Sequence, residues 1–382
     1  MRILVIPTTD WIRHPVPNRL NYIFDILARD HEIFVLHFPI GQFSANEPRS
    51  TSCHLVKSGP LPVKDPSLFY LLNAPFHLIT LIRVIREQKI DVILSANILP
   101  SLLATICKVP IVFDYLDHLE ESASIYYPGS LFGKLVKSIV KRITRYNLGH
   151  SSSIITVTPD FYDYLTHAGF SDIYVIPNGV DTSSLKEIPL SEARSQLNLR
   201  GPVIGYIGSL EYWVDLETVI ETLPELDVIL LVIGPGLFTD YGNLLRTLAE
   251  EKGVSDRVIF TGLIPFRELS LYISAMDIGL NPLKKMAKNE MTVGGKVFNY
   301  LACGKPVLSS RMHALERMLG DDLFYYDDPE SFAGQVRAIL AAPGEPARYR
   351  ALATEYDWEH LSARYEKVLK SALCSDHSDK EE

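Results

Sequence analysis

The chain has 382 residues, of which 47% are hydrophobic, so it can bury a large core and is long enough for two domains. Its formal net charge is −9. Residues 1–180 carry 16 Lys and Arg against 15 Asp and Glu, whereas the other residues carry 21 against 31. Because the acidic half has no basic stripe interleaved with aromatic residues, nucleic acid is excluded as a partner.

Cysteine usage and hydropathy indicate the compartment. The four cysteines, at positions 53, 107, 303 and 374, show no C-x-x-C spacing, which fits a reducing cytoplasm and excludes a zinc site. The opening MRILVIPTTD lacks the features of a signal peptide and predicts a strand. No run reaches the roughly 20 apolar residues that span a bilayer, since the best candidate, 68–84, contains Asn73, Pro75 and Arg83. We therefore expect a cytoplasmic protein.

In residues 1–180 the sequence predicts strands that alternate with helices. The expected strands are Arg2–Ile6, Ile33–Phe38, Asp91–Ser95, Pro110–Asp114 and Ser153–Thr158, and the expected helices are Asn18–Arg29, Phe76–Gln88, Leu99–Cys107 and Pro159–Ala168. This alternation favours an open parallel sheet with right-handed crossovers. Ligands of such a sheet bind beyond the carboxyl ends of its strands, which selects the loops Pro7–Arg19, Ser95–Pro100 and Asp114–Ser124.

The stretch Leu131–Asn147 predicts an amphipathic helix whose polar face is entirely basic. Apolar residues recur at helical spacing, and the opposite face carries Lys134, Lys137, Lys141, Arg142 and Arg145. No acidic residue occurs from Ser122 to Pro159. A face of this kind is attracted to anionic lipid or to a lipid-phosphate acceptor, which predicts peripheral membrane contact. The alternative is that the apolar face is used entirely in packing on the sheet.

The segment IPNGVD, residues 176–181, combines proline, asparagine and glycine and predicts a turn between two domains. Beyond it, residues 203–220 predict a strand, a glycine turn and a helix. Residues 228–236 predict a central strand that ends in Gly-Pro-Gly, and another strand and loop follow at 257–265. No G-x-G-x-x-G follows a strand, which excludes a dinucleotide site of that type.

The stretch Met291–Ser310 carries the strongest local signal. It predicts a glycine turn, a helix at Gly295–Cys303, a glycine stop at Gly304 and a buried strand. We expect Thr292 to cap the helix. A helix start with free N–H groups favours a phosphate, and Lys296 in its first turn adds a full positive charge. The alternative is a solvated lysine on a surface helix.

KVFNYLACGKPVLSS, residues 296–310, resembles the K-x-x-E-Y-L-A-x-G-K-P-V segment of GT-B-fold, nucleotide-sugar-dependent glycosyltransferases. The likeness is to group 1, family 4-like members of the teichuronic-acid type and covers most of the chain. Asn299 replaces the family's ribose-binding glutamate, and Glu290 lies one position before the place of a second glutamate. In many relatives an Arg and a Lys near the turn at Gly208 clamp the diphosphate. This chain has neither residue there, because Ser209 follows Gly208. Its EYWVDLE stretch resembles a branch of the family that has W-x-D.

This resemblance implies an α/β fold of GT-B type, with two doubly wound Rossmann-like domains facing across a cleft. Residues 1–180 would form the acceptor domain and 181–355 the nucleotide-sugar domain. A helix at 356–373, with Trp358 near its start, would cross back to the first domain, and 374–382 would be a disordered tail.

The resemblance also implies roles for residues. The implied donor-binding set comprises Gly208, Ser209, Gly234, Ile264, Pro265, Glu290, Gly294, Gly295, Lys296, Val297 and Asn299. The position of the first strand-end loop makes Asp10, Arg13, His14 and Arg19 the expected acceptor contacts, with a plain surface role as the alternative. Lys296 would stabilise the leaving diphosphate, and Asp117 or His118 would be the base that receives the acceptor proton.

The implied activity is that of a retaining hexosyltransferase, which moves a sugar from a nucleotide-diphosphate sugar to a hydroxyl group. The acceptor would be a glycan or a lipid-linked saccharide of cell-surface polysaccharide or glycoconjugate synthesis. The nucleotide sugar is a co-substrate and no cofactor is expected. The sequence contains no D-x-D carboxylate pair, so we expect no metal at the diphosphate. The enzyme would work at the inner face of the cell membrane.

Two other functions stay open from the sequence. A nucleotide-sugar epimerase of the same fold would convert the donor without an acceptor. A non-catalytic subunit or scaffold would explain the missing basic clamp and Asn299. Fold does not decide between these functions.

Overall fold

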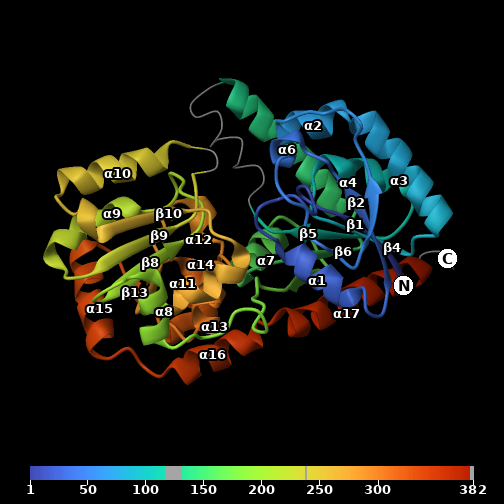
Figure 1. Cartoon of the computed structure of the whole chain (residues 1–382). Coiled ribbons are helices and arrows are strands. Elements are labelled where there is room, and N and C mark those ends of the chain that lie inside the picture. Colours follow the sequence, from blue (N-terminus) through green and yellow to red (C-terminus); the bar gives the residue numbers. More distant parts are fainter. Residues whose placement is uncertain (118–130, 237–238, 379–382) are drawn as a thin grey trace. The chain divides into compact units, whose positions relative to one another are not determined.

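The computed structural model describes residues 1–117, 131–236 and 239–378, which belong to two compact units (Figure 1). Unit 1 contains Met1–Pro177 and the C-terminal segment from Trp358, and unit 2 contains Asn178–Asp357. The chain thus passes from unit 1 to unit 2 within the IPNGVD segment. It returns to unit 1 at the start of its last helix.

Unit 1 is built on a seven-stranded parallel sheet of spatial order β3-β2-β1-β4-β5-β6-β7. The strands are β1 (Arg2–Ile6), β2 (Glu32–His37), β3 (His54–Lys57), β4 (Val92–Ser95), β5 (Ile111–Tyr115), β6 (Ser153–Thr156) and β7 (Ile173–Val175). The described helices are α1 (Arg19–Leu27), α2 (Pro66–Leu72), α3 (Ala74–Gln88), α4 (Leu99–Ala104), α6 (Leu131–Gly149), α7 (Pro159–His167) and α17 (Trp358–Ser378), with short 3-10 turns η1 (Gly41–Phe43) and η2 (Thr105–Cys107).

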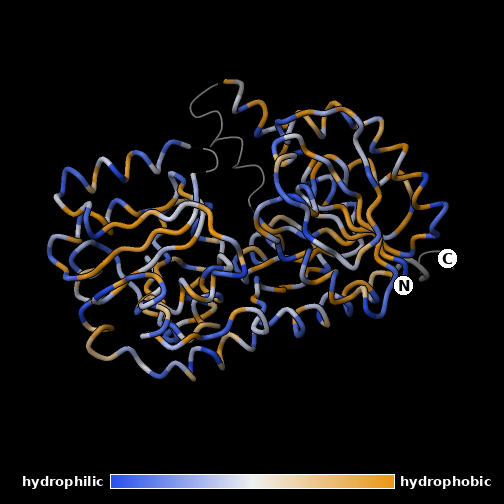
Figure 2. The backbone as a smooth tube through the Cα atoms, viewed as in Figure 1, coloured by the Kyte–Doolittle hydropathy of each residue, from blue (hydrophilic) through white to orange (hydrophobic). Residues whose placement is uncertain are grey.

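Both faces of the unit 1 sheet are covered. Neighbouring residues of β1 point to opposite sides, so Ile3 and Val5 pack with α1 and α17, whereas Leu4 and Ile6 pack with α2, α3 and α4. All four side chains are completely buried. This two-sided burial explains why β1 is a continuous apolar run, and Figure 2 shows hydrophobic residues along the strands of each sheet.

The last helix, α17, belongs to the core of unit 1. Trp358 at its start stacks on Tyr22 of α1, with 5.6 Å between the ring centroids, and Tyr365 is fully buried further along. The helix continues to Ser378, beyond its predicted end at residue 373, because no proline or glycine interrupts it. The prediction of a disordered tail is therefore wrong for 374–378, and residues 379–382 lie outside the described ranges.

Unit 2 is built on a six-stranded parallel sheet of order β10-β9-β8-β11-β12-β13. The strands are β8 (Val203–Ile207), β9 (Ile229–Ile233), β10 (Val258–Gly262), β11 (Ile278–Asn281), β12 (Val307–Ser310) and β13 (Phe324–Tyr326). The described helices are α8 (Leu190–Leu197), α9 (Leu216–Thr222), α10 (Tyr241–Glu251), α11 (Leu269–Ser274), α12 (Ala287–Glu290), α13 (Lys296–Ala302), α14 (His313–Leu319), α15 (Pro329–Ala341) and α16 (Pro346–Glu355), with 3-10 turns η3 (Leu223–Glu225), η4 (Ser255–Arg257), η5 (Phe266–Glu268) and η6 (Gly320–Asp322).

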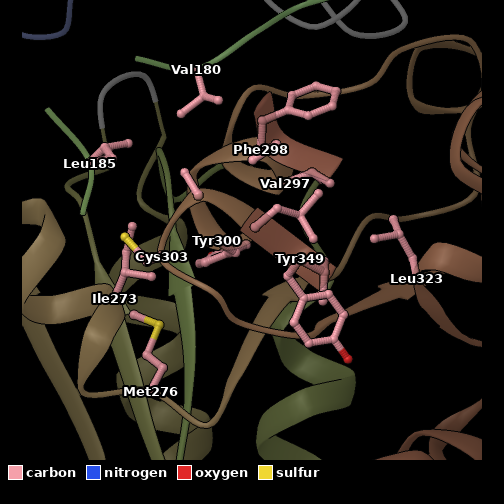
Figure 3. Close-up of a cluster of buried hydrophobic side chains, with 14 of the residues drawn as sticks. Val180, Leu185, Ile273, Met276, Val297, Phe298, Tyr300, Cys303, Leu323 and Tyr349 are labelled. Atoms are coloured by element: carbon pink, nitrogen blue, oxygen red, sulfur yellow. The ribbon is translucent and has the colours of Figure 1, made fainter. Parts of the chain in front are cut away.

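The unit 2 sheet is also covered on both faces. Leu231 and Ile233 pack on the side of α11, α13 and α14, and Leu230 and Val232 pack on the side of α9, α10 and α15. Figure 3 shows α13 side chains, including Tyr300, among buried residues from other elements of this core. Both units are therefore doubly wound α/β domains, as the sequence predicts.

Candidate functional site

The helix α13 begins and ends at glycines. Gly304, just past the helix, has φ +70, and a Cβ there would lie 2.8 Å from Arg350 Nη1. This confirms the predicted glycine stop. The prediction that Thr292 caps α13 is wrong, because the hydroxyl of Thr292 donates to the carbonyl of Lys288 and so closes the preceding helix α12.

Three neighbouring strands of unit 2 end in glycines with positive φ. Gly208 follows β8 at φ +145, Gly234 follows β9 at φ +125, and Gly262 ends β10 at φ +69. A Cβ on Gly234 would lie 2.1 Å from the carbonyl oxygen of Gly208, so no larger residue fits there. Bare backbone therefore lines the carboxyl edge of the sheet, where ligands of such folds bind.

The ammonium of Lys296 lies beside this glycine edge. Its Nζ is 4.2 Å from the ring centroid of Tyr206 and 3.2 Å from the place that a Cβ on Gly208 would take. Within the described ranges, no carboxylate forms an ion pair with it. Burial lowers the pKa of Lys296 to about 7. A cation that has no counter-charge in the described part of the chain, and that lies beside a glycine backbone, is an arrangement that attracts an anion.

A chain of hydrogen bonds holds the ring below Lys296. The Tyr206 hydroxyl donates to the carbonyl of Ser209 at 2.8 Å, and the Ser209 hydroxyl donates to Glu211 Oε1 at 2.6 Å. Glu211 Oε2 accepts from the hydroxyl of Thr239 at 2.9 Å, and Glu211 is completely buried. Sequence reasoning missed Tyr206 and Glu211. For Glu211 the only local signal is that it is the first residue of the acidic EYWVDLE stretch.

Tyr300 fixes α13 to the sheet. Its hydroxyl accepts from the N–H of Ile207 at 2.8 Å and donates to the carbonyl of Leu280 at 3.1 Å. A Cβ on Gly279 would lie 2.3 Å from the Tyr300 ring, so the ring rests directly on the backbone of β11. Because Tyr300 lies one turn after Lys296 on the same helix, it sets where the ammonium lies.

Other predicted donor residues take different positions. Glu290 Oε2 accepts from the N–H of His313 at 2.9 Å and so caps α14. Asn299 is partly exposed, and its side-chain amide has no hydrogen-bond partner among the described residues. A Cβ on Gly294 would meet open space, whereas the side chain of Val297 is completely buried in the core.

The remaining predicted donor positions lie in loops. A Cβ on Gly295 would come no closer than 3.9 Å to the carbonyl of Gly179. After Gly262, Ile264 is partly buried against the unit 2 core and Pro265 is exposed at the start of η5. Ile264 and Pro265 thus follow the same carboxyl edge as the three glycines.

The basic residues near Lys296 are already engaged. Lys284 Nζ lies 2.7 Å from Glu217 Oε1, and Lys285 Nζ lies 3.4 Å from Asp327 Oδ1. The Nζ of Lys288 lies 4.5 Å from the ring centroid of Trp213. These three lysines therefore contact partners within unit 2, whereas Lys296 pairs with no carboxylate of the described ranges.

In unit 1, Asp10 lies at the carboxyl edge with one carboxylate oxygen used and one unused. Oδ1 accepts from the N–H groups of Ile12 at 3.1 Å and Arg13 at 2.8 Å. Oδ2 is buried and has no hydrogen-bond partner among the described residues.

The Nδ1 of His37, at the end of β2, lies 3.8 Å from Asp10 Oδ1. Burial lowers the pKa of His37 despite the opposing charge of Asp10. Sequence reasoning missed His37.

Two further acceptor candidates, Arg13 and His14, are partly buried and hold their own loop together. Arg13 donates to the carbonyl of Ser44 at 3.1 Å and of Asn46 at 2.5 Å. His14 Nδ1 lies 2.7 Å from the carbonyl oxygen of Val16, and burial lowers the pKa of His14. The structure therefore places both residues in the predicted loop. Their acceptor role stays a prediction.

Arg19 lies inside unit 1. Its Nη2 donates to the carbonyl of Ile176 at 2.8 Å, and its Nε is 3.7 Å from Asp114 Oδ2. The Tyr365 hydroxyl donates to the same Asp114 oxygen at 2.7 Å. Burial raises the pKa of Asp114, whereas Arg19 opposes this. Arg19 is therefore committed to an internal ion pair between α1 and β5.

The predicted base candidates follow β5. Asp117 is partly buried just beyond the carboxyl end of that strand. His118 lies outside the described residues. The structure thus places Asp117 at the expected edge and leaves the choice of base as a prediction.

The helix α6 exposes part of its apolar side. Leu131, Leu135 and Ile139 are exposed at 84%, 58% and 47%. Among its predicted basic residues, Lys137 is partly buried, and the exposed ones are Lys134, Lys141, Arg142 and Arg145. The alternative that packing on the sheet uses the whole apolar face is therefore wrong.

In the described ranges no single helix is long and apolar enough to cross a bilayer, although α2 and α3, which meet at a bend of 68°, are long and apolar enough when taken together. No group of three or more His, Cys, Asp or Glu side chains in those ranges is placed to hold a metal ion. All four cysteines have free thiols.

Comparisons with known proteins match both units. Residues 25–184 match the model of Glycosyltransferase Family 4, and residues 201–342 match that of Glycosyl transferases group 1. The putative teichuronic acid biosynthesis glycosyltransferase TuaH of Bacillus subtilis is 26% identical over 64% of this chain. The alpha-monoglucosyldiacylglycerol synthase of Streptococcus pneumoniae is 25% identical over 69% of this chain. The match spans 62% of the length of each relative.

Solved structures share the fold. Sucrose-phosphate synthase from Thermosynechococcus elongatus has a TM-score of 0.78 at 18% identity, over 98% of this chain and 100% of that one. Anabaena HepE in complex with UDP has a TM-score of 0.72 at 18% identity, over 97% and 100% of the two chains. These likenesses confirm the predicted GT-B fold class.

Proposed function

Because this chain belongs to the glycosyltransferases of group 1 and family 4, we propose that it moves a hexose from a nucleotide-diphosphate sugar to a hydroxyl group of a glycan or lipid-linked acceptor. One observation carries the proposal. The ammonium of Lys296 has no counter-charge among the residues that the structure describes and lies beside the glycine edge of β8 and β9. A diphosphate is the anion that this edge suits, since backbone can approach its oxygens closely.

Lys296 then acts on the leaving group. Negative charge develops on the diphosphate as its bond to the sugar breaks, and a fixed cation at that place lowers the barrier. The Tyr206 ring holds the ammonium without neutralising it. A bound diphosphate favours the charged form and so raises the lowered pKa of Lys296 again.

We propose that the diphosphate needs no metal bridge. The support is the absence of a D-x-D pair from the sequence, together with the position of Lys296. We also propose retention of the anomeric configuration, because the family resemblance implies it. NMR of the first product formed from a donor of known configuration tests this.

Unit 1 is proposed to bind the acceptor. Asp10 offers an unused carboxylate oxygen at the carboxyl edge of its sheet, and Asp117 follows a neighbouring strand end. The names of the two relatives, one in teichuronic acid biosynthesis and one a glucosyldiacylglycerol synthase, support a glycan or lipid acceptor. The exposed apolar and basic side chains of α6 support contact with the inner face of an anionic cell membrane.

Thermal unfolding against UDP, GDP, dTDP, ADP and CMP, each with and without EDTA, tests the proposal. A nucleotide at about 100 times its Kd adds roughly 2.7 kcal/mol to stability. We expect one nucleotide to stabilise the chain in EDTA and Lys296→Ala to lose that effect. Lys252→Ala is the matched control, since Lys252 pairs with Glu221 on the surface of the same unit. Stabilisation by none of the nucleotides would contradict the proposal and favour a non-catalytic subunit.

A further inference from the structure

The bent helix pair α2 and α3 presents an apolar surface to solvent. Exposed side chains occur at helical spacing on both helices, with Ile106 of η2 next to α3. The α2–α3 surface consists of Leu68 (50% exposed), Leu71 (61%), Leu72 (51%), Phe76 (40%), Ile79 (63%) and Ile106 (63%). So many large apolar side chains on one surface mark an interaction site.

The core of unit 1 does not need these side chains. The opposite faces of α2 and α3 carry Phe69, His77 and Leu81, which are completely buried. Phe69 and His77 pack edge-on against Phe38 in the core, and His77 Nδ1 lies 2.7 Å from the hydroxyl of Ser58. The inner faces therefore anchor the pair, and the outer faces have no partner within the described ranges.

The charges around this surface are mostly positive. Between Asp65 and Glu87 the only charged residues are Arg83 and Arg86, and both are exposed. Lys64, Lys89 and Lys108 nearby are also exposed, and so are the acidic residues Asp65, Glu87 and Asp91, so exposed cations outnumber exposed anions by five to three. In a chain of net charge −9 this is a local excess. A second copy would bring like charges together, whereas an anionic bilayer offers both an apolar interior and opposite charge.

The α2–α3 surface is also linked to α6. Both α2 and α3 pack against α4, and so does α6 (Figure 1). These three helices, each with exposed apolar side chains, therefore all contact the same short helix of unit 1. Two surfaces of similar chemistry on one rigid unit suit a single extended partner.

We propose that the α2–α3 surface inserts its apolar side chains into an anionic lipid bilayer, with α6 as the second contact. The inference deepens the proposed function and rests on its membrane contact. Leu71 and Ile79 would enter the acyl region, while Arg83 and Arg86 would face the phosphate groups. Unit 1 would then receive a lipid-linked acceptor directly from the bilayer.

Sedimentation of the full chain with vesicles tests this. Vesicles of phosphatidylglycerol and phosphatidylcholine are compared with vesicles of phosphatidylcholine alone. We expect binding to the anionic vesicles, and the double variant Leu71→Gln, Ile79→Gln should lower the partition coefficient at least about 10-fold. Leu244→Gln is the control, since Leu244 is a 45% exposed residue of α10 in unit 2. Because all three positions are exposed, each variant should keep the wild-type unfolding temperature.

Three outcomes would overturn the proposal. The first is that the Leu71→Gln, Ile79→Gln variant binds anionic vesicles as well as the wild type does, while a Lys134→Gln, Lys141→Gln variant loses binding. That result would leave α6 as the membrane contact. The second is a wild-type dimer by light scattering that the double variant converts to a monomer without any vesicle binding. The third is a wild type that binds no vesicles, which also removes the membrane part of the proposed function. Nucleotide stabilisation is measured separately, so its loss alone would contradict only the transferase proposal.

Discussion

The Nζ of Lys296 lies 4.2 Å from the centre of the Tyr206 ring. The two residues come from α13 and β8, and Tyr300 of α13 bonds to the backbone of Ile207 next to Tyr206. The cation is therefore positioned by an aromatic face and a rigid helix. A carboxylate in that place would have neutralised it.

Replacing Lys296 by Ala should lower kcat by about 100-fold or more, if the loss of one leaving-group contact resembles the loss of an oxyanion donor. The measurement is the initial rate of sugar transfer with the nucleotide sugar that the binding test identifies. Lys252→Ala should keep the wild-type rate. A Lys296→Ala variant with a near-normal rate would remove this lysine from the mechanism.

Nucleotide affinity should depend on pH through Lys296. In the free protein burial lowers the pKa of Lys296 to about 7, and a bound diphosphate raises it again. Binding therefore takes up a proton, and the affinity falls as the pH rises above 7. We expect the Kd to increase by up to about tenfold per pH unit between pH 7 and 9. Titration calorimetry at several pH values measures this.

The Lys296→Gln variant is the control for that pH dependence, because its side chain does not titrate. Whereas nucleotide affinity falls as the pH rises above 7, the stability of the nucleotide-free protein should increase. The unfolded lysine keeps its ordinary pKa of 10.5, so above pH 7 the unfolded chain binds more protons and Lys296 contributes stability that rises with pH. A flat Kd in the wild type would contradict the prediction.

Much of the fold follows from local sequence patterns. The run Arg2–Ile6 is apolar throughout because both of its faces are buried, so its strand and the parallel sheet are predictable. The strand β3, His54–Lys57, has mostly exposed side chains at the edge of the sheet and gives no such signal. The helix Pro66–Leu72 was missed because its outward residues are apolar and hide the amphipathic pattern.

The candidate site is predictable only where its chemistry is local. Gly304 and Lys296 stand in one short segment, so the turn and the charge could be predicted together. Tyr206 was missed because its contact with Lys296 joins positions far apart in the sequence. Thr292 shows the opposite error, since its hydroxyl can serve either the helix before it or the helix after it.

Gly234→Ala should destabilise unit 2 by about 3 kcal/mol or more, because a Cβ would collide with the backbone and the left-handed conformation is strained for alanine. The nearest atom to that Cβ would be the Gly208 oxygen at 2.1 Å. Urea unfolding measures the change. Gly242→Ala in α10 is the control, since its Cβ would meet only Leu210 Cδ1 at 3.4 Å. That control should be neutral or stabilise by up to about 1 kcal/mol.

Tyr300→Phe should cost about 1–3 kcal/mol, because it leaves the buried N–H of Ile207 without an acceptor. It should also lower the transfer rate, since α13 loses a bond that positions Lys296. Urea unfolding and initial rates measure the two effects. Tyr212→Phe, at a 51% exposed side chain in the same unit, should change neither. An unchanged free energy of unfolding in Tyr300→Phe would show that water replaces the hydroxyl.

Asp10→Asn should weaken binding of the sugar acceptor without changing binding of the nucleotide. The amide keeps an oxygen for the N–H groups of Ile12 and Arg13, so the loop should keep its fold. The substitution replaces Oδ2, which has no hydrogen-bond partner among the described residues, by an NH2 group. That group cannot accept a hydrogen bond from the hydroxyl of the sugar acceptor. We expect the acceptor KM to rise about tenfold, the cost of one hydrogen bond to a charged group, with nucleotide stabilisation unchanged. Asp30→Asn, at an exposed position of unit 1, is the control. An Asp10→Asn variant with a normal acceptor KM and a weaker nucleotide effect would contradict the acceptor role of Asp10.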